Sequence, residues 1–289
     1  MLVTLKEILE TAEGKGQAVG AFNCTGLESL MAVISAAEEL NHPVIIQFAE
    51  GHGKLIDFDI MAPIMLSFAH KATVPVCVHF DHGESFDSCK KAIDAGFTGV
   101  MIDGSSLPYE ENIALTAKVV KYAHEKGASV EAELGSMYAS EVGAIEPGKN
   151  QELSTEDAYT DPDQAKEFTE RTGVDALAVS FGTSHGVYLT KPVLDLDRVT
   201  LIKEKAGIPL VMHGGSGLTT SEFQTAIRNG IRKVNYYTYM IMEGGKAAAD
   251  YVKQADDQGI YFFHDIMNAA RDAMKKQVME EIRVFALEK

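Results

Sequence analysis

The sequence predicts a single domain with the (β/α)8, or TIM-barrel, fold over residues 1–289. Eight short apolar runs typical of buried strands alternate with helical patterns along the chain. Polar residues able to carry chemistry follow these runs, at the strand ends where barrels of this type form their sites. A length of 289 residues with 46% apolar residues also suffices for one large core.

The strand-like runs are nearly continuous in apolar character, which is typical of parallel strands covered on both faces. Between them, residues 27–40 and 112–127 show apolar residues every three to four positions, and Gly127 provides a stop signal. An open doubly wound sheet is the alternative, but it usually carries a glycine-rich turn after its first strand, and AFNCTGLE at 21–28 is not one. The eight predicted strands span residues 18–24, 43–49, 74–80, 99–103, 129–134, 176–181, 209–213 and 233–238.

The composition disfavours several classes of function. A net charge of −16 and a pI near 5.0 argue against nucleic acid and against an anionic membrane surface as partners. The chain has no run of eighteen apolar residues and no signal-peptide pattern at its start, so we expect a cytoplasmic protein. Cys24, Cys77 and Cys89 lack CxxC spacing, so neither a disulfide framework nor a structural zinc site is expected.

Polar residues at the ends of seven predicted strands should meet at one mouth of the barrel. Each of them alone has an ordinary structural explanation, such as a helix cap or a histidine bound to the backbone. Their shared position favours one functional site. These residues are Asn23, Asp81, His82, Asp103, Glu133, His185, His213, Ser216 and Asn235.

Three histidines in this set, His82, His185 and His213, suggest a metal site. Three imidazoles with an open fourth position are a common catalytic zinc arrangement, whereas a structural site usually has four ligands that include cysteine. His79 is an alternative to His82, because it shares the inward strand face of Asp81. The other histidines are in helical or loop contexts where solvation or capping is expected: His42, His52, His70, His124 and His264.

A glycine–serine loop after the seventh strand indicates a phosphate site. The run HGGSGLTTSEF at 213–223 places small residues before the expected start of a helix, where backbone N–H groups and the helix dipole favour an anion. Barrels frequently bind phosphate with the loops after strands seven and eight. We therefore expect a metal-assisted reaction on a phosphorylated small molecule.

The motifs resemble those of the class II, metal-dependent ketose-bisphosphate aldolases, a family that includes fructose-bisphosphate and tagatose-bisphosphate enzymes. The resemblance covers nearly the whole chain. Its motifs here are AFN at 21–23, HFDHG at 79–83, residues 96–113, VEAELG at 130–135, residues 159–168 and 172–188, PLVMHGGSGL at 209–218 and GIRKVN at 230–235.

This resemblance implies an aldehyde-lyase that reversibly cleaves a phosphorylated ketose into dihydroxyacetone phosphate and an aldehyde through a zinc-stabilised enediolate. It implies one catalytic Zn2+ per subunit, held by the three histidines named above, with Asp81 as the acid/base. A monovalent cation is a further candidate, and family members lead us to expect a homodimer or homotetramer. The residues implied to hold the triose phosphate group are Gly186, Gly214, Ser216, Asn235 and Thr238.

Further roles follow from the position of acidic and amide residues. The family resemblance implies a second acid/base, which exchanges the triose proton, on the loop after the fifth strand, here 136–157, where Glu141 is the candidate. Glu133 and Asp103 are expected to support the metal-ligating histidines by accepting their outer N–H groups. Asn23 is expected to contact the substrate.

Two departures from the family pattern bear on the substrate. Fructose-type enzymes carry an aspartate in an NxDTD segment, whereas residues 235–239 read NYYTY, which favours the tagatose-type and ketose-1-phosphate branch. His264 stands where a DPR arginine binds the second phosphate in other members, with Arg271 as a candidate replacement. A mostly neutral imidazole is a poor substitute for a guanidinium. We therefore expect a ketose 1-phosphate whose aldehyde half is longer and either uncharged or carboxylated, with a 1,6-bisphosphate as the other substrate class.

Other functional classes stay open. A zinc hydrolase usually shows an HxH pair on its first strand, and this strand ends in AFNC. A non-catalytic sugar-phosphate-binding protein would be expected to lack Asp81 or a zinc ligand, and all are present. A Schiff-base aldolase needs a lysine at the site, but Lys233 is expected at the start of the eighth strand, at the opposite end of the barrel.

Overall fold

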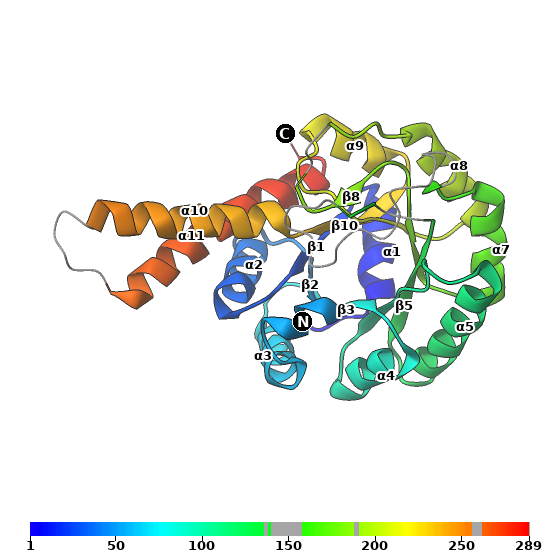
Figure 1. Cartoon of the computed structure of the whole chain (residues 1–289), viewed down its shortest axis with the longest axis horizontal. Coiled ribbons are helices and arrows are strands. Elements are labelled where there is room, and N and C mark those ends of the chain that lie inside the picture. Colours follow the sequence, from blue (N-terminus) through cyan, green and yellow to red (C-terminus); the bar gives the residue numbers. More distant parts are fainter. Residues whose placement is uncertain (136–137, 140–157, 188–190, 256–261, 289) are drawn as a thin grey trace.

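Eight parallel strands close into a barrel in the order β1-β10-β9-β7-β5-β4-β3-β2 (Figure 1). The computed structural model describes residues 1–135, 138–139, 158–187, 191–255 and 262–288. The predicted (β/α)8 barrel is confirmed. The barrel strands are β1 Val19–Asn23, β2 Val44–Ala49, β3 Val76–Gly83, β4 Gly99–Ile102, β5 Ser129–Leu134, β7 Ala176–Val179, β9 Leu210–Met212 and β10 Ile231–Tyr236.

The last strand differs most from its prediction. It begins at Ile231 and ends at Tyr236, two residues earlier at each end than the predicted 233–238. The earlier start arises because Ile231 pairs with Leu210 of β9, and the earlier end because the next helix begins at Thr238. Lys233 is therefore in the middle of β10 and not at its start.

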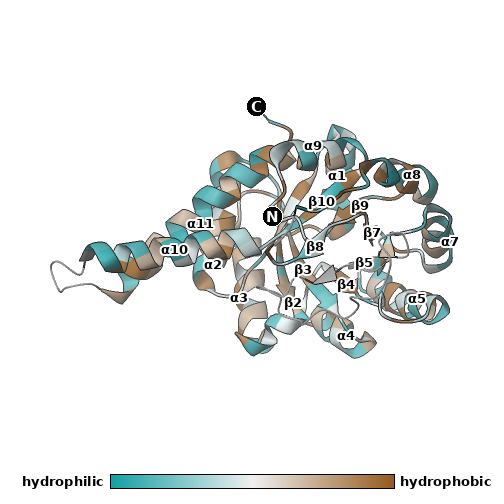
Figure 2. Ribbon diagram, turned by 45° about the horizontal axis from the view of Figure 1, so that its top comes forward, coloured by the Kyte–Doolittle hydropathy of each residue, from teal (hydrophilic) through white to brown (hydrophobic). Residues whose placement is uncertain are grey.

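Helices surround the barrel, and hydrophilic and hydrophobic residues alternate along them (Figure 2). The helix predicted at 27–40 is confirmed with the same bounds, and the one predicted at 112–127 begins three residues earlier. The helices are α1 Leu5–Lys15, α2 Leu27–Leu40, α3 Phe58–Lys71, α4 Phe86–Ala95, α5 Tyr109–Glu125, α7 Pro162–Thr172, α8 Leu196–Ala206, α9 Thr220–Arg228, α10 Thr238–Ala255 and α11 Phe263–Phe285, with the short 3-10 helix η1 at Glu50–Lys54.

The barrel interior changes character along its axis. Near the N-terminal ends of the strands, inward residues form an apolar cluster that α1 closes from below. We call this cluster the apolar half: Leu5, Ile8, Leu9, Ala12, Val19, Ala21, Ile45, Cys77, Ala176, Ala178 and Val211. Above it are buried polar side chains, which we call the polar half: Asn23, Gln47, His79, Asp81, Glu131, Glu133, His213, Lys233 and Asn235.

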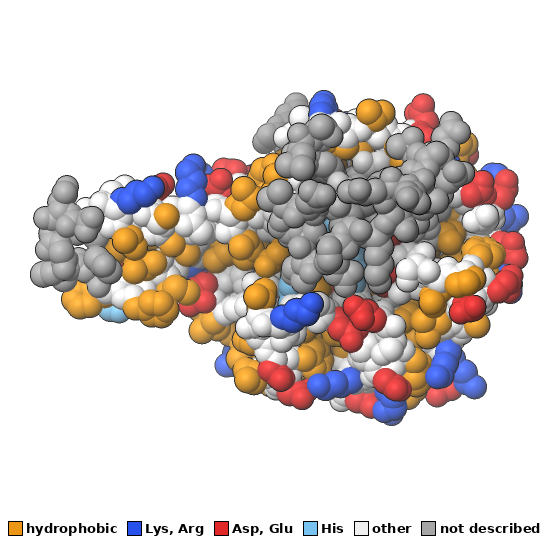
Figure 3. Space-filling view, in the orientation of Figure 1, with side chains coloured by type: hydrophobic (Ala, Val, Ile, Leu, Met, Phe, Trp, Pro, Cys, Tyr) orange, Lys and Arg blue, Asp and Glu red, His pale blue; other side chains and the backbone are white. Residues whose placement is uncertain are grey.

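The last two long helices, α10 and α11, form a hairpin that projects from the barrel (Figure 1). The returning helix packs against α2 and β1, and its C-terminal residue Phe285 is fully buried. Hydrophobic side chains gather on the hairpin in the space-filling view (Figure 3). Its exposed large hydrophobic residues include Met242, Phe262 and Phe263. No helix in the described part of the chain is both long and apolar enough to cross a membrane.

Candidate active site

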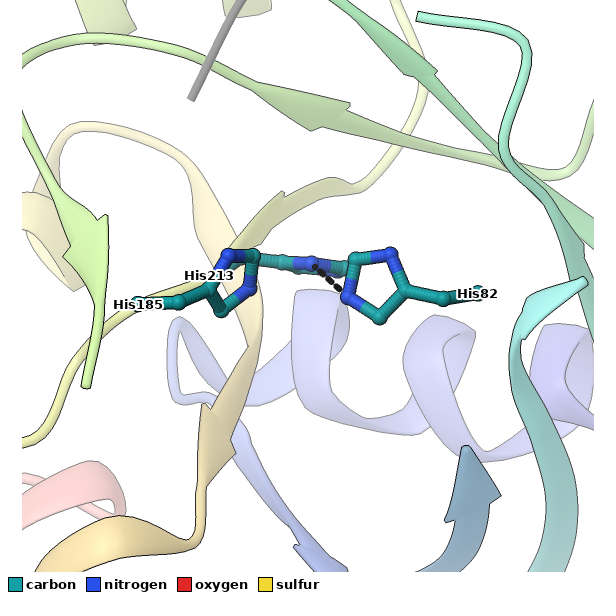
Figure 4. A group of neighbouring side chains, drawn as sticks. All are labelled: His82, His185 and His213. Carbon is teal, nitrogen blue, oxygen red and sulfur yellow. Dashed lines mark hydrogen bonds between the residues drawn. The ribbon is translucent and has the colours of Figure 1, made fainter. Parts of the chain in front are cut away.

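Three histidines from separate segments converge at the mouth of the barrel, and their rings face one another (Figure 4). Their ring centroids are 4.7 Å apart for His82 and His213, 5.1 Å for His82 and His185, and 5.7 Å for His185 and His213. One nitrogen of each ring is within 4.8 Å of a nitrogen of both others. The three residues singled out in the sequence are thus brought together.

His82 reaches this position through an irregularity at the end of β3. In a regular strand it would point away from the interior, because Asp81 points inward. The pairing of β3 with β4 shifts register between Phe80 and Gly83, and His82 has a left-handed backbone with φ 48°. Such a conformation costs a non-glycine residue roughly 1–3 kcal/mol and is typical of functional positions. The bulge lets two consecutive residues, Asp81 and His82, serve one site.

Gly83 makes this bulge possible by a close approach of neighbouring atoms. A Cβ at this position would be 2.6 Å from the Cys89 Sγ and 2.7 Å from the Met101 carbonyl oxygen. Both separations are below any real contact of a Cβ, so a larger residue would displace the strand end. The glycine of the HFDHG motif is therefore needed for packing.

His185 lies beyond the sixth barrel strand, which was predicted at 176–181. Strand β7 ends at Val179, and His185 belongs to the short strand β8, Ser184–His185. This strand pairs in parallel with β6, Tyr138–Ala139, in a second, two-stranded sheet. The extra sheet directs the loop after β7 so that His185 faces the other two histidines.

Carboxylates hold the outer nitrogens of two of the rings. The Nδ1 atom of His82 is 2.9 Å from the Oδ2 atom of Asp103. The Oδ1 atom of Asp103 accepts hydrogen bonds from the hydroxyl and backbone N–H of Ser105. The Nε2 atom of His213 is 2.8 Å from the Oε1 atom of Glu131. Such pairs orient metal-ligating imidazoles and make them more basic. Asp103 has the position expected for it, whereas Glu131 and not Glu133 supports His213.

Glu133 is instead beside the inner nitrogen of His213. Its Oε2 atom is 3.7 Å from the Nδ1 atom of that ring and has no hydrogen-bond partner among the described residues. With His82 and Asp103 it forms a second group of ligand atoms within 4.8 Å of one another. Burial and the nearby Asp103 carboxylate raise the pKa of Glu133 well above its usual value. Sequence reasoning missed Glu131, although the alternation in VEAEL predicts that both glutamates point inward.

The arrangement fits a divalent metal ion such as zinc. The Nε2 atom of His82 and the Nδ1 atom of His213 are 3.1 Å apart, close to the separation of about 3.3 Å between two ligands of a tetrahedral zinc. The Nε2 atom of His185 is buried and lacks a hydrogen-bond partner in the described structure, as expected for a ligand atom. His79 is fully buried below, 3.4 Å from Glu131, and belongs to neither group of ligand atoms found in the described residues.

Electrostatics distinguish the three rings. Burial opposes the charged form of His82, but the nearby Asp81 and Asp103 carboxylates raise its pKa to about 10. Burial lowers the pKa of His185 to about 3 and lowers that of His213 as well. Two rings are therefore neutral and ready to bind a metal near pH 7, whereas a metal has to displace a proton from His82.

Asp81 is held in one orientation by three amide groups. Its Oδ2 atom accepts hydrogen bonds from Asn23 at 2.8 Å and from Gln47 at 3.1 Å, and its Oδ1 atom accepts one from Asn235 at 3.2 Å. Burial would raise its pKa, but His82 and Lys233 hold it well below the usual range. Asp81 is thus a buried, fixed carboxylate. Asn23 and Asn235, expected to contact the substrate and its phosphate, both use their side-chain amides to hold it.

Glycines allow the two loops that are expected to bind phosphate to approach each other closely. Gly214 has φ 66°, and a Cβ there would be 2.3 Å from the carbonyl oxygen of Ser184. Ser216 is buried in the same loop. The helix expected after this loop is confirmed: Thr219 caps α9 with its side chain, and α9 begins at Thr220. The other helix at this end of the barrel, α10, begins at Thr238 directly after β10.

Some predicted residues are elsewhere. His264 is in the first turn of α11, where its side chain is 73% exposed, stacks on Phe262 and pairs with Asp265. Arg271, further along the same helix, pairs with Asp272. Both belong to the projecting hairpin, so neither joins the histidine cluster of its own chain (Figure 1). Glu141 lies outside the described residues.

A further histidine, which the sequence did not indicate, borders the site. His52 was expected to be solvated or capping, but it is only 2% exposed. Its ring packs against Tyr237 with centroids 4.9 Å apart. Burial lowers its pKa to about 4, with smaller effects from Asp81 and His82, which places it near both. His52 and Tyr237 form a wall between η1 and the end of β10, a contact between distant segments that no local pattern reveals.

Comparison with known proteins yields one consistent family. Residues 3–289 match the family described as fructose-bisphosphate aldolase class-II. The fructose-bisphosphate aldolase of Staphylococcus aureus (strain Mu50 / ATCC 700699) is 41% identical over 287 residues, 98% of this chain and 97% of the relative.

Solved structures agree with this match. The crystal structure of the YdjI aldolase from Escherichia coli K12 superposes with a TM-score of 0.84 at 38% identity, over 99% of this chain and 97% of the other. The fructose-bisphosphate aldolase of Campylobacter jejuni has a TM-score of 0.81 at 22% identity, over 98% and 95%, and supports the fold alone. This chain therefore belongs to the class II fructose-bisphosphate aldolase family.

Proposed function

We propose that this protein is a metal-dependent aldolase that reversibly cleaves a phosphorylated ketose into dihydroxyacetone phosphate and an aldehyde. The observation that carries the proposal is the convergence of His82, His185 and His213 beside a fixed, anionic Asp81. Class II aldolases use a divalent metal, generally zinc, and the three histidines would hold it here. When bound, the metal polarises the ketose carbonyl and stabilises the negative charge that bond cleavage leaves on the triose.

Asp81 is the proposed acid/base for the carbon–carbon bond. It takes the proton of the C4 hydroxyl as the C3–C4 bond breaks, and it returns this proton to the aldehyde oxygen in the condensation direction. Its three amide partners leave it little freedom to rotate, so its oxygens are already oriented before substrate binds. Glu141 remains the proposed second acid/base, which exchanges the proton of the triose.

The phosphate of the triose half is proposed to bind between two loops and a helix. Gly186, Gly214 and Ser216 offer closely packed backbone and a buried hydroxyl, and Thr238 begins α10. The positive end of a helix dipole favours a phosphate there. These groups supply local attraction for an anion although the whole chain carries a net charge of −16.

The proposed substrate is a ketose 1-phosphate rather than a 1,6-bisphosphate. No arginine or lysine replaces the DPR arginine within the FFHD segment, and His264 lies on the hairpin. Tyr237, packed on His52, lines the mouth where fructose-type enzymes carry an aspartate. This choice places the chain in the tagatose-type and ketose-1-phosphate branch. The relatives described above bear the name of the fructose-bisphosphate enzyme as well as YdjI aldolase, so the substrate is decided by assay.

We further propose a homodimer or homotetramer in the cytoplasm. The hairpin exposes Met242, Phe262 and Phe263, and a second copy of this chain would remove these side chains from water. A subunit arrangement of this kind could bring His264 and Arg271 to a neighbouring site. A monovalent cation is a further proposed ligand.

The test is a coupled assay for release of dihydroxyacetone phosphate, with and without chelator. The panel contains fructose and tagatose 1,6-bisphosphates and several ketose 1-phosphates. Chelator-sensitive release supports the aldolase, and the highest kcat/KM among the 1-phosphates supports the proposed substrate. Far more efficient cleavage of the bisphosphates would overturn the substrate proposal. If no compound is cleaved, the hydrolase and sugar-phosphate-binding alternatives return.

A further inference from the structure

We propose that Lys233 is a positioning residue of this aldolase, a buried ammonium that holds Asp81 and His213 in place. It acts through a hydrogen bond to Asn235 and an ion pair with Glu131. The inference rests on the proposed function. It concerns a lysine that does not touch substrate but reaches both the acid/base and a metal ligand through one intermediate residue each. The sequence had placed this lysine at the far end of the barrel.

Lys233 is in the barrel interior and is 0% exposed. Its backbone pairs with Val19 of β1 and Val211 of β9, at the level of the apolar half. Its side chain extends from there into the polar half, where the Nζ atom contacts Glu131 and Asn235. A lysine in this position costs several kcal/mol of desolvation unless it is paired. Its contacts with Glu131 and Asn235 supply this pairing.

The first contact leads to the metal site. The Nζ atom is 2.8 Å from the Oε2 atom of Glu131, and the other carboxylate oxygen of Glu131 is 2.8 Å from the Nε2 atom of His213. Each carboxylate oxygen thus has its own cation or donor, so the carboxylate cannot rotate without losing one of them. The inner nitrogen of His213 is consequently directed toward His82. His79 also approaches the Oε2 atom of Glu131, at 3.4 Å, and is outside both groups of ligand atoms found in the described residues.

The second contact leads to the acid/base. The Nζ atom donates a hydrogen bond to the Oδ1 atom of Asn235 at 2.7 Å, and the Nδ2 atom of Asn235 donates to Asp81 at 3.2 Å. An ammonium has donors only, so it selects the amide orientation in which the oxygen faces Lys233 and the NH2 group faces Asp81. Without the lysine this amide could rotate and present its oxygen to the carboxylate. Lys233 thereby determines one of three hydrogen bonds that orient Asp81.

A purely structural role for Lys233 is the alternative, and a neighbouring residue allows the two to be separated. Arg232 is also on β10 and also buried, and its Nε atom is 3.1 Å from the Oε2 atom of Glu13 on α1. Alternation along the strand points it away from Lys233, toward the outside of the barrel. Removing either cation should lower stability. Only removal of Lys233 should change metal binding and kcat.

The experiment compares Lys233→Met with Arg232→Met in the full chain. Metal-free protein is titrated with Co2+ and followed by its visible absorption, and kcat and KM are measured on the best substrate of the panel. For Lys233→Met we expect Co2+ affinity to fall about 10- to 100-fold, as for other partners of metal-ligating histidines. We expect kcat to fall about 100-fold with KM nearly unchanged, because Asp81 is misplaced. Arg232→Met should retain both properties with a lower Tm.

A double-mutant cycle tests the path to the metal. If Lys233 acts through Glu131, Co2+ affinity in Glu131→Gln/Lys233→Met should equal that in the weaker single variant, whereas independent effects would add. Should Lys233→Met not fold, Lys233→Gln, which removes the charge but keeps a donor amide, is measured instead. Wild-type Co2+ affinity and kcat in a folded Lys233 variant would overturn the inference. Absence of aldolase activity in the unmodified protein would overturn the proposed function, while the Co2+ titration would still test the link to His213.

Discussion

The two halves of the barrel interior are built from the same strands and differ almost completely in chemistry. In β1 the inward residues pass from Val19 to Asn23, in β2 from Ile45 to Gln47, and in β3 from Cys77 to Asp81. The apolar half gains stability by removing side chains from water. The polar half contains ionised groups that cost free energy unless each is paired. One pattern of alternation thus supports two tasks, with stability at one end of each strand and chemistry at the other.

The largest expected effect is loss of a proposed metal ligand in the polar half. His213→Ala should abolish stoichiometric metal binding, because the ring contributes one of only three imidazoles, and activity should fall to that of chelated wild type. Metal content by atomic spectroscopy and the coupled assay measure this. His79→Asn is the control: it removes a buried histidine of β3 that is outside the ligand group, and it should retain one metal per chain. Loss of metal in the control would show that the ligands are misassigned.

Replacing the acid/base should remove activity while leaving the metal in place. In Asp81→Asn the side chain keeps its size but can no longer accept a proton, so kcat should fall about 10²- to 10⁴-fold. Metal content should remain near that of wild type, since Asp81 is outside the three-histidine group. Both quantities are measured on one preparation. A variant with near wild-type kcat would assign the proton transfer to another residue.

The apolar half should show the opposite response. Ile45→Ala removes a fully buried side chain and should lower the free energy of unfolding by about 2–5 kcal/mol. The value of kcat below the unfolding transition should stay within a few-fold of wild type, because this side chain is one layer away from the site. Urea unfolding and steady-state kinetics give the two numbers. A loss of kcat comparable to that of Asp81→Asn would contradict the division between the halves.

A half-buried carboxylate on α11, outside the barrel interior, offers a pH test. Burial raises the pKa of Glu281 to about 7. Its folded pKa is thus above the unfolded value, so its contribution to stability is complete below about pH 4.5 and is lost as the pH rises through about 7. By linkage this loss is at most about 3 kcal/mol. Glu281→Gln should therefore gain stability relative to wild type between pH 5 and pH 8 in urea unfolding, with kcat unchanged. A difference that does not depend on pH would show that Glu281 is ionised in the folded protein.

The smallest expected effect concerns the wall made by His52 and Tyr237. Tyr237→Ala removes one of two packed rings, whose contact is worth about 0.5–1.5 kcal/mol. In the condensation direction, KM for the aldehyde should therefore rise about two- to tenfold, while KM for dihydroxyacetone phosphate stays the same. Tyr237→Phe, which keeps the ring, should behave like wild type. An equal rise in both KM values would place this wall at the triose phosphate instead.

Much of the site could be predicted from the sequence because functional residues of this fold lie at the C-terminal ends of the strands. Asp81, Asp103 and His213 needed only the position of each strand end and the chemistry of each side chain. His82 also needed the bulge in β3, and His185 the pairing of β8 with β6. Glu131 and Lys233 were missed for a different reason. Alternation shows that a residue faces the interior, but the height it reaches depends on its length and on the residues across the barrel.

The repeating pattern of strands and helices, the apolar core and the convergence of three histidines were determined by the sequence itself, since period and order are local properties of the chain. Only the tertiary structure decided which glutamate contacts His213, how a bulge turns His82 inward, and that Lys233 contacts the partners of both Asp81 and His213. These features depend on register between strands and on contacts between residues far apart in the chain. Such features arise only in the closed barrel, where each buried charge is paired.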